Sequence, residues 1–313
     1  MKRFGLTGAA GYIAPRHMKA IMETGNELVA AFDPNDSVGI MDSHFPNAHY
    51  FTEFELFDAH VDQLRRRQKA IDYISIASPN YLHESHMMFA LRSGADAICE
   101  KPIVLWPDQL DRVIENERDS GQKVNTILQL RLHPAIVKIR EQVQQNLKEN
   151  KYDVDLTYIT SRGNWYLKSW KAEIAKSGGI ATNIGVHFFD MLHFIFGDLQ
   201  ESVVHLAKDT KSAGYLEYEH ARVRWYLSLD VEDVPSAVRE TGQRTYRSIT
   251  VDGSEIEFSG GFTDLHNISY AQILDGNGFD LETNRTAIET VSEIRVAQPQ
   301  NLTGSYHPFA KNQ

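Results

Sequence analysis

The stretch Phe4-Gly5-Leu6-Thr7-Gly8-Ala9-Ala10-Gly11-Tyr12-Ile13-Ala14 lies near the start of this 313-residue chain. Its first four residues favour a short strand, and the apolar periodicity after the glycines favours a helix that ends at Gly25. Gly8 permits a tight turn, Gly11 lets the main chain approach a pyrophosphate, and Ala14 lets the helix pack against the strand. The stretch therefore predicts a dinucleotide-binding turn formed by Gly8, Ala10, Gly11, Tyr12 and Ile13.

An acidic residue follows the next predicted strand. Leu28 to Phe32 ends at Asp33, about 20 residues beyond the glycines, where a ribose-binding acid is expected. A carboxylate there accepts hydrogen bonds from the ribose and repels a 2′-phosphate, so the sequence predicts NAD rather than NADP as the cofactor. Two observations count against a dinucleotide site. The glycine spacing is one residue off the usual one, and an aspartate before Pro34 can simply start a turn.

Strand and helix patterns alternate through the first 128 residues. Further strands are expected at 48–51, 71–77, 97–99 and 123–128, and further helices at 60–69, 82–92 and 107–120. This alternation predicts an α/β fold whose N-terminal domain, residues 1–128, is a Rossmann domain with a doubly wound parallel sheet.

The periodicity changes in the second part of the chain. Strand-like segments at 154–160, 202–207, 221–229, 245–251 and 256–258 follow one another without helices between most of them, and helices are expected at 134–150, 177–196 and 283–296. This predicts a C-terminal α+β domain, residues 129–313, with an open, largely antiparallel sheet. We expect it to bind substrate and to form a homo-oligomer, a dimer or tetramer, through the exposed face of the sheet. The last helix is expected to pack back on the first domain.

Composition excludes several classes of protein. A net charge of -10 argues against nucleic acid as a partner, and no apolar run approaches the ~18 residues of a membrane span. Cys99 is the single cysteine, so no intrachain disulfide can form, which suits a cytoplasmic protein. We expect no metal site, no membrane association and a cytoplasmic location.

A charged pair follows the strand predicted at 97–99. Glu100-Lys101-Pro102 places a lysine at the carboxyl edge of the parallel sheet, where open α/β sheets bind ligands. Taken alone, such a pair is most often exposed on a loop, so the prediction depends on the motifs around it.

Several short motifs occur in the order typical of one family. Ser78-Pro79-Asn80-x-x-His83, Glu100-Lys101-Pro102 and Gln129-x-Arg131-x-x-Pro134 resemble those of the Gfo/Idh/MocA oxidoreductases, and the resemblance spans essentially the whole chain. It implies that Lys101 lies beside the nicotinamide and the reacting carbinol. It also implies that the cofactor site includes Ser78, Asn80, His83 and Glu100.

A second dense motif lies at 177–190. On a helix, Asn183 and His187 would share one face, four residues apart, although a histidine there can also be an ordinary core residue. The segment resembles the family signature Gly-Gly-x-x-x-Asp-x-Gly-x-His-x-x-Asp, in which the acid and the histidine frame the substrate carbinol. His187 matches, whereas Asn183 replaces the acid. We therefore expect Asn183 to position the substrate without titrating, and Asp190 to be structural.

The segment 162–176 is basic, with four basic residues and one acid in a chain that is acidic overall. Arg162, Tyr166, Trp170 and Lys171 suit an anionic, ring-shaped ligand, although an exposed hairpin tip with fortuitous charges would look the same. With the Asn183 departure, this segment resembles the WlbA/WbpB-like branch of the family. That branch comprises UDP-N-acetyl-2-amino-2-deoxyglucuronate 3-dehydrogenases of bacterial surface-polysaccharide synthesis, and the resemblance implies a UDP-sugar substrate.

Three questions stay open at this level. Alcohol oxidation needs a proton acceptor, for which Lys101 and His187 both qualify; we favour His187 as the base and Lys101 as the polarising group. Arg131 and Arg162 are candidate anchors for the anionic substrate, although Arg131 could instead pair with an acid. The alternatives to the nucleotide-sugar enzyme are a dehydrogenase of another sugar or polyol and a non-catalytic NAD- or sugar-sensing regulator.

Overall fold

A computed structural model describes residues 1–147, 150–256 and 264–312. The chain forms two compact units: Met1–Gln129 with Thr263–Arg285, and Leu130–Phe262 with Thr286–Gln313. The first unit thus includes α9 (Leu265–Leu274), a helix that the sequence does not predict. The second unit contains all but the first residue of α10 (Arg285–Val296), the helix expected to pack on the first domain.

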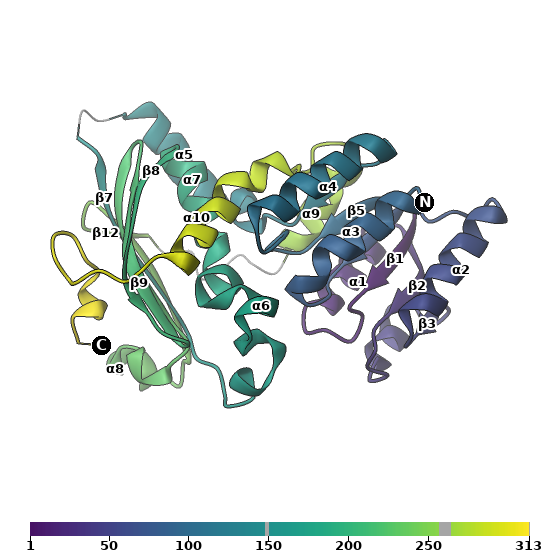
Figure 1. Cartoon of the computed structure of the whole chain (residues 1–313), viewed down its shortest axis with the longest axis horizontal. Helices are drawn as coiled ribbons and strands as arrows, with labels where there is room; N and C mark the ends of the chain where they lie inside the picture. Colours follow the sequence, from purple (N-terminus) through teal and green to yellow (C-terminus); the bar gives the residue numbers. More distant parts are fainter. Residues whose placement is uncertain (148–149, 257–263, 313) are drawn as a thin grey trace. The chain divides into compact units, whose positions relative to one another are not determined.

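The first unit is built on a six-stranded parallel sheet in the order β3-β2-β1-β4-β5-β6 (Figure 1). Its strands are β1 (Arg3–Thr7), β2 (Glu27–Phe32), β3 (His49–Phe51), β4 (Tyr73–Ile76), β5 (Asp96–Cys99) and β6 (Val124–Thr126). The predicted doubly wound fold is confirmed. The strand order reverses between β1 and β4, and ligands of such sheets bind at the carboxyl ends of the strands beside that point.

Helices cover both faces of this sheet because side chains alternate along each strand. Phe4 of β1 stacks on Tyr270 of α9, with ring centroids 6.0 Å apart, on the face that also packs against α1 (Ala14–Glu23). Gly5 faces the other way, toward Phe57 of α2 (Phe54–Arg66). Two further helices follow, α3 (His83–Arg92) and α4 (Pro107–Ser120). α2 starts six residues before the start predicted for it.

The second unit contains a six-stranded sheet in the order β12-β11-β7-β10-β9-β8. Its strands are β7 (Tyr152–Thr160), β8 (Leu199–Ala207), β9 (Lys211–Tyr218), β10 (Ala221–Ser228), β11 (Thr245–Val251) and β12 (Ser254–Ile256). β7 and β10 pair in parallel and the other neighbours pair antiparallel, which confirms the largely antiparallel sheet. Residues 257–258 of the last predicted strand lie outside the described residues.

The sequence analysis does not predict β9, whose Lys211-Ser212-Ala213-Gly214 contains a glycine, a residue typical of turns. In the structure this glycine is required by packing. A Cβ atom at Gly214 would lie 2.2 Å from the carbonyl oxygen of Val203 and 2.8 Å from the ring of Trp225. Gly214 therefore lies inside a strand, at a point where the neighbouring main chain and an indole approach closely.

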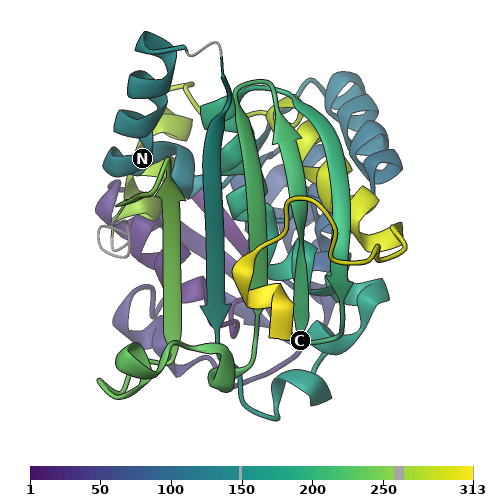
Figure 2. The ribbon, with the colours of Figure 1, turned by 90° about the vertical axis from the view of Figure 1, so that its left-hand side faces the viewer.

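One face of this sheet packs against helices, where Phe188 and Phe189 of α7 (Val186–Phe196) contact Tyr158 and Trp225. α5 (Pro134–Gln145) packs against α7 and ends five residues before its predicted end. On the other face the C-terminal segment crosses the strands, as Figure 2 shows, and His307 stacks on Tyr226. The short helix α8 (Ser236–Arg239) follows β10.

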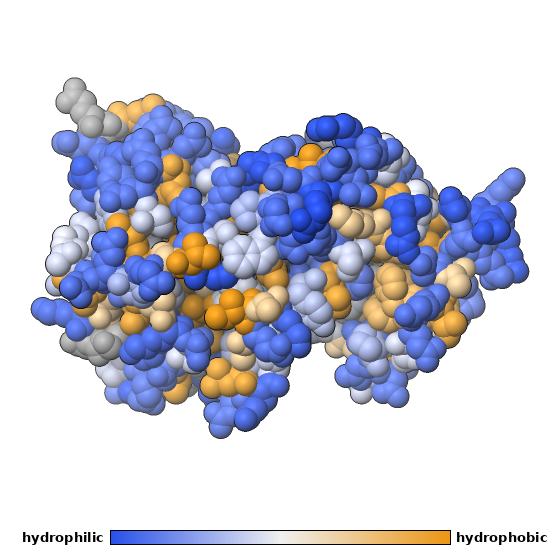
Figure 3. Space-filling model, viewed as in Figure 1, coloured by the Kyte–Doolittle hydropathy of each residue, from blue (hydrophilic) through white to orange (hydrophobic). Residues whose placement is uncertain are grey.

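One face of the molecule is mainly polar. Hydrophilic side chains predominate on the face shown in Figure 3, and the apolar ones are scattered among them. Among the helices that the structure describes, none has both the length and the hydrophobicity needed to cross a bilayer.

Candidate active site

The glycine turn between β1 and α1 is tightly fixed. Gly8 has φ +82° and donates its N–H to the carbonyl of Phe32 at 2.8 Å. A Cβ atom at this position would lie 2.5 Å from the main-chain carbonyl of Ala77 and the nitrogen of Ser78. Only glycine satisfies both the left-handed conformation and this close approach to the end of β4.

The start of α1 offers main-chain donors. Within the described residues, the N–H groups of Tyr12 and Ile13 have no hydrogen-bond acceptor, and no side chain caps the helix. Tyr12 is also 91% exposed. Unpaired N–H groups at a helix N-terminus are the usual partners of a phosphate, so this turn fits the pyrophosphate of a dinucleotide.

Asp33 lies beside the same turn. Its Oδ2 accepts a hydrogen bond from the N–H of Ala10 at 3.0 Å, and its Oδ1 accepts one from the N–H of Asn35 at 2.9 Å. The hydroxyl of Tyr50 donates to the carbonyl oxygen of Asp33 at 2.8 Å, and burial, with Asp33 as a second cause, raises the pKa of Tyr50 to about 12. The half-buried carboxylate is thus held next to the glycine turn, as a ribose-binding acid requires.

His83 connects the ends of two neighbouring strands. Its Nδ1 lies 2.7 Å from the carbonyl oxygen of Pro102, and its Nε2 lies 2.8 Å from that of Ser78. The hydroxyl of Ser78 lies 2.9 Å from Nδ1 of His86. Asn80 is buried one turn before His83. These contacts tie the segment after β4 to Pro102, directly after Lys101, and so restrict the main chain of the Glu-Lys-Pro turn.

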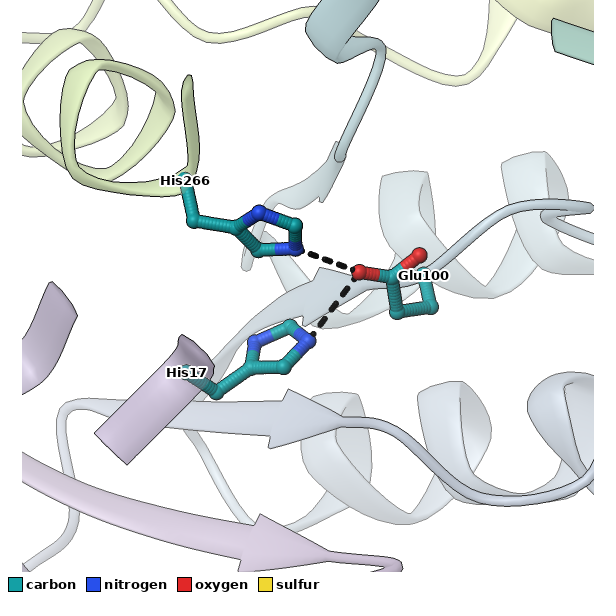
Figure 4. A group of neighbouring side chains, drawn as sticks. All are labelled: His17, Glu100 and His266. Atoms are coloured by element: carbon teal, nitrogen blue, oxygen red, sulfur yellow. Dashed lines mark hydrogen bonds and ion pairs between the residues drawn. The ribbon is translucent and has the colours of Figure 1, made fainter. Parts of the chain in front are cut away.

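Glu100 is held by two histidines that the sequence analysis does not single out. Nε2 of His17, on α1, lies 3.2 Å from Oε1 of Glu100, and Nε2 of His266, on α9, lies 2.8 Å from the same oxygen (Figure 4). The other carboxylate oxygen accepts the N–H of Lys101 at 3.3 Å. Burial acts to raise the pKa of Glu100, but the two histidine hydrogen bonds outweigh it and hold the pKa well below its usual range.

This cluster has a donor set that zinc accepts in other proteins, two imidazoles and one carboxylate, with the ligand atoms all within 4.8 Å of one another. No ion is needed to explain the geometry. Both imidazole Nε2–H groups donate to the carboxylate, and Nδ1 of His17 lies 2.7 Å from the hydroxyl of Tyr270. We therefore interpret the cluster as a hydrogen-bonded network.

The motif at 177–190 is not one continuous helix, so the helix predicted over 177–196 is wrong in its first half. α6 (Ile174–Ser177) ends at Gly178 and Gly179, which have φ of +80° and +77°, conformations that interrupt a right-handed helix. A π-helical turn, Ala181–Gly185, follows, and α7 begins at Val186. Gly185 allows this turn to approach β10, since a Cβ atom there would lie 2.7 Å from Leu227.

Asn183 therefore lies in the π-turn and His187 in the first turn of α7. Both are half-exposed, whereas their neighbours Thr182, Ile184 and Val186 are buried. The wider turn of a π-helix means that the two side chains are not stacked as they would be on an α-helix.

The basic segment contributes a partner to Asn183. Nδ2 of Asn183 donates to the hydroxyl of Tyr166 at 2.8 Å, and burial raises the pKa of this tyrosine. The ammonium of Lys171 lies 4.2 Å from the ring centroid of Trp170, and burial, then the charge of Arg162, lowers its pKa. Arg162 itself is exposed. The structure thus brings Tyr166 to Asn183, and Lys171 to Trp170.

Arg131 pairs with a buried acid. Its Nε lies 3.0 and 3.1 Å from the two carboxylate oxygens of Asp190, and its Nη2 lies 2.7 Å from Oδ1. The side chains of Arg131 and Asp190 are only 10% and 2% exposed. This is the arrangement that the sequence analysis considered as the alternative to substrate contact, and it agrees with a structural Asp190.

Comparison with known proteins identifies the family. The model of the oxidoreductase family with an NAD-binding Rossmann fold matches residues 2–127, and the model of its C-terminal alpha/beta domain matches residues 140–255. The chain belongs to the Gfo/Idh/MocA oxidoreductase family. The resemblance inferred from the motifs is confirmed, and the NAD-binding description agrees with the glycine turn, the open start of α1 and Asp33.

Two solved structures of one enzyme are similar to nearly the whole chain. The WlbA (WbpB) dehydrogenase of Thermus thermophilus in complex with NAD and α-ketoglutarate is 52% identical, with 99% of this chain and all of that chain covered and a TM-score of 0.95. The same enzyme with NAD and UDP-GlcNAcA is 51% identical, with the same coverage and TM-score. Among curated proteins, YteT of Bacillus subtilis is 26% identical over 65% of this chain, which spans about half of that relative, 48%.

Proposed function

We propose that this protein oxidises the 3-hydroxyl of UDP-N-acetylglucosaminuronic acid with NAD as the hydride acceptor. The observation that carries this proposal is the similarity to the Thermus thermophilus enzyme solved with NAD and UDP-GlcNAcA, 51% identical over 99% of this chain. In the reaction the C3 hydride passes to NAD and the hydroxyl proton to a base. The products are the 3-keto sugar, NADH and a proton. Bacterial surface-polysaccharide synthesis is the process that such a product would serve.

Lys101 and His187 are the residues that we propose for the chemistry. Bound NAD supplies the hydride acceptor; the chain supplies a proton acceptor and a positive charge to stabilise the developing alkoxide. An imidazole can accept a proton near neutral pH, so we assign the role of base to His187 and the polarising role to Lys101. The contacts of His83 and Glu100 with the Glu-Lys-Pro turn support this assignment, because they restrict the position of Lys101.

Substrate binding is proposed for the segment around Asn183. Asn183 and Tyr166 are hydrogen-bonded to each other, so they can present an amide and a phenol in a fixed relation. Trp170 and Lys171 form a cation–π pair that offers an apolar ring face beside a positive charge. Of the two candidate arginines, we propose exposed Arg162 as the anchor for a carboxylate or phosphate. Arg131, whose guanidinium binds Asp190, is proposed to fix α7 instead.

Mass spectrometry of the product tests the proposal. The purified protein is incubated with NAD and UDP-N-acetylglucosaminuronic acid, with and without α-ketoglutarate as an oxidant for NADH. We expect a product two mass units lighter than the substrate, and at least a hundredfold loss of turnover in Lys101→Met and His187→Asn. Retention of the wild-type rate in both variants, with NAD still bound, would show that the site is wrong. A wild type that binds NAD and leaves the nucleotide sugar unchanged would refute the substrate.

We also propose that the protein is a cytoplasmic homo-oligomer assembled through the outer face of the second sheet. A single buried cysteine supports a reducing compartment. On the outer face, Arg224 of β10 and Asp155 of β7 form a cross-strand ion pair beside the C-terminal segment. Sedimentation at several protein concentrations tests the oligomer, and a species with the mass of one chain throughout would refute it.

A further inference from the structure

The three side chains in Figure 4 come from distant parts of the chain and meet at one oxygen atom. His17 lies on α1, Glu100 follows β5, and His266 lies on α9; the figure shows both imidazoles directed at the carboxylate. All three are at least 93% buried. All belong to the first unit, so the cluster is part of the dinucleotide-binding fold itself.

The hydrogen-bond pattern determines the charge of this cluster. A carboxylate only accepts, so the Nε2 of each histidine must carry the proton that it shares with Glu100. Nδ1 of His17 lies 2.7 Å from the hydroxyl oxygen of Tyr270, which lies 2.6 Å from that of Ser75, so an unprotonated Nδ1 can accept from Tyr270 while Tyr270 accepts from Ser75. His17 is neutral in this network, and burial lowers its pKa accordingly.

The position of the proton on His266 follows from a similar argument. Nδ1 of His266 is buried and has no hydrogen-bond partner among the described residues. An unpaired lone pair at this atom costs less than an unpaired N–H would, so the geometry favours the tautomer with its proton on Nε2. The cluster therefore carries one net negative charge, on Glu100, and within the described part of the chain the ion-pair contacts of Glu100 are with these histidines alone.

A buried charge without a lysine or arginine partner is unusual, because desolvation is expensive unless an opposite charge compensates it. Glu100 lies at the carboxyl edge of the sheet, directly before Lys101, the residue that the family resemblance places beside the nicotinamide. The oxidised nicotinamide ring carries a positive charge and the reduced ring is neutral. A fixed carboxylate nearby therefore acts differently on the two forms of the cofactor.

We infer that Glu100, held as a carboxylate by His17 and His266, sets the preference of this protein for oxidised over reduced dinucleotide. The inference rests on the proposed function, because it assumes that the nicotinamide binds at Lys101. The inference goes beyond the proposed function by assigning a role to two histidines and a glutamate that contribute no proton to the reaction. At an effective dielectric constant of about 20, a unit charge about 12 Å away alters the affinity for a cation by roughly tenfold.

The test is a binding measurement that needs no turnover. Dissociation constants for NAD and for NADH are measured by calorimetry at pH 7.5 for the wild type, Glu100→Gln and Glu100→Asp. Glu100→Gln removes the charge, and we expect the ratio of NAD affinity to NADH affinity to fall about tenfold. Glu100→Asp keeps the charge, so the ratio should stay within about threefold of the wild type even if both affinities fall. His60→Asn, on α2, removes a histidine outside this network and should leave the ratio unchanged.

His266→Leu gives an independent measurement, which also decides the matter if Glu100→Gln does not fold. Loss of one donor raises the pKa of Glu100, so the ratio of NAD affinity to NADH affinity should begin to fall at a higher pH in this variant than in the wild type.

An unchanged ratio in Glu100→Gln would overturn the inference, as would a ratio that falls at the same pH in His266→Leu as in the wild type. So would an equal change in Glu100→Asp and Glu100→Gln, because it would indicate a purely structural role. Stoichiometric zinc in the wild type that is lost from His266→Leu would also overturn it. A wild type that binds neither form of the cofactor would instead refute the proposed function.

Discussion

At the scale of single residues, the candidate site depends on side chains that fix other side chains. Asp33 binds the N–H of Ala10, Asn183 binds Tyr166, and Arg131 binds Asp190. Substitutions in the three pairs should affect different measurements. The Asp33 pair has a charged acceptor, and the Asn183 pair has no ionisable group near neutral pH. The Arg131 pair is an ion pair.

Changing Asp33 to alanine should narrow the preference for NAD over NADP by about 10- to 100-fold, since it removes both the ribose acceptor and the repulsion of a 2′-phosphate. It also takes the acceptor from the N–H of Ala10. Asp33→Asn separates the effects, because its amide oxygen can still accept that bond while the charge is gone. Affinities for both cofactors give the result; a wild-type protein that prefers NADP would contradict the prediction.

Asn183→Asp should add an ionisation to the pH profile of kcat/KM. The amide of Asn183 donates to the hydroxyl of Tyr166, whereas an aspartate would accept from it, so the bond can persist with its direction reversed. We expect a new acid limb between about pH 4 and pH 6. Tyr166→Phe serves as the control, because it removes the bond without adding an ionisable group. If the pH profile and the KM of Asn183→Asp were identical to those of the wild type, Asn183 would not contact the substrate.

Arg131→Gln should destabilise the second unit by about 3 kcal/mol or more, because it leaves the carboxylate of Asp190 buried without its cation. Arg162→Gln changes an exposed residue, so it should leave stability unchanged and weaken nucleotide-sugar binding by about 10-fold. Denaturant unfolding and substrate titration of both variants test the assignment. If Arg131→Gln instead weakened nucleotide-sugar binding without loss of stability, and Arg162→Gln did not weaken it, Arg131 would be the substrate anchor.

At the scale of elements, the glycine turn is the part of the fold that local chemistry explains most completely. Gly8 and Gly25 both have positive φ, at the start and the end of the connection through α1. They differ in their surroundings, because nothing lies within 4 Å of a Cβ atom built on Gly25, whereas one on Gly8 would meet the main chain of Ala77 and Ser78 at 2.5 Å.

Gly25→Ala should therefore lower the free energy of unfolding by only about 1 kcal/mol, the cost of placing alanine in a left-handed conformation. The affinity for NAD should be unchanged. Gly8→Ala should cost several times more and weaken NAD binding, because the β1–α1 turn must move away from the end of β4. Urea unfolding and NAD titration of the two variants make the comparison. Equal effects at the two positions would show that the close approach to β4 has no energetic consequence.

At the scale of the whole molecule, buried neutral histidines couple folding to pH in both units. Burial lowers the pKa of His86, in the first unit, and of His307, in the second, to about 4 each. In the unfolded chain both titrate near 6.5, so between about pH 6.5 and pH 4 the unfolded state binds more protons. Stability is thus fully present above pH 6.5 and decreases as the pH falls toward 4.

At pH 5 this loss should amount to about 2 kcal/mol for each of the two histidines. Thermal unfolding at pH 7 and pH 5 measures it, and His307→Gln, which does not titrate, should show a smaller decrease. Equal melting temperatures of the wild type at the two pH values would contradict the prediction, as would an equal decrease in the variant.

The sequence by itself determined the doubly wound first domain, the largely antiparallel second sheet and the cofactor turn. These features rest on signals that lie close together in the chain: the Gly8–Ala14 spacing, the acid after β2, and the alternation of apolar residues. The sequence analysis missed β9 and the break at Gly178–Gly179, because a glycine alone does not reveal whether it makes a turn, ends a helix or accommodates a neighbouring side chain.

Only the tertiary structure decided which partner each polar side chain takes. His17 and His266 meet Glu100 across 83 and 166 residues of sequence, and Arg131 meets Asp190 across 59. No local pattern encodes such pairs, because each depends on where two separately formed elements come to lie in the folded unit. A buried carboxylate can be held ionised only when those elements deliver their donors together, and for that reason the role of Glu100 follows from the fold and not from the Glu-Lys-Pro motif alone.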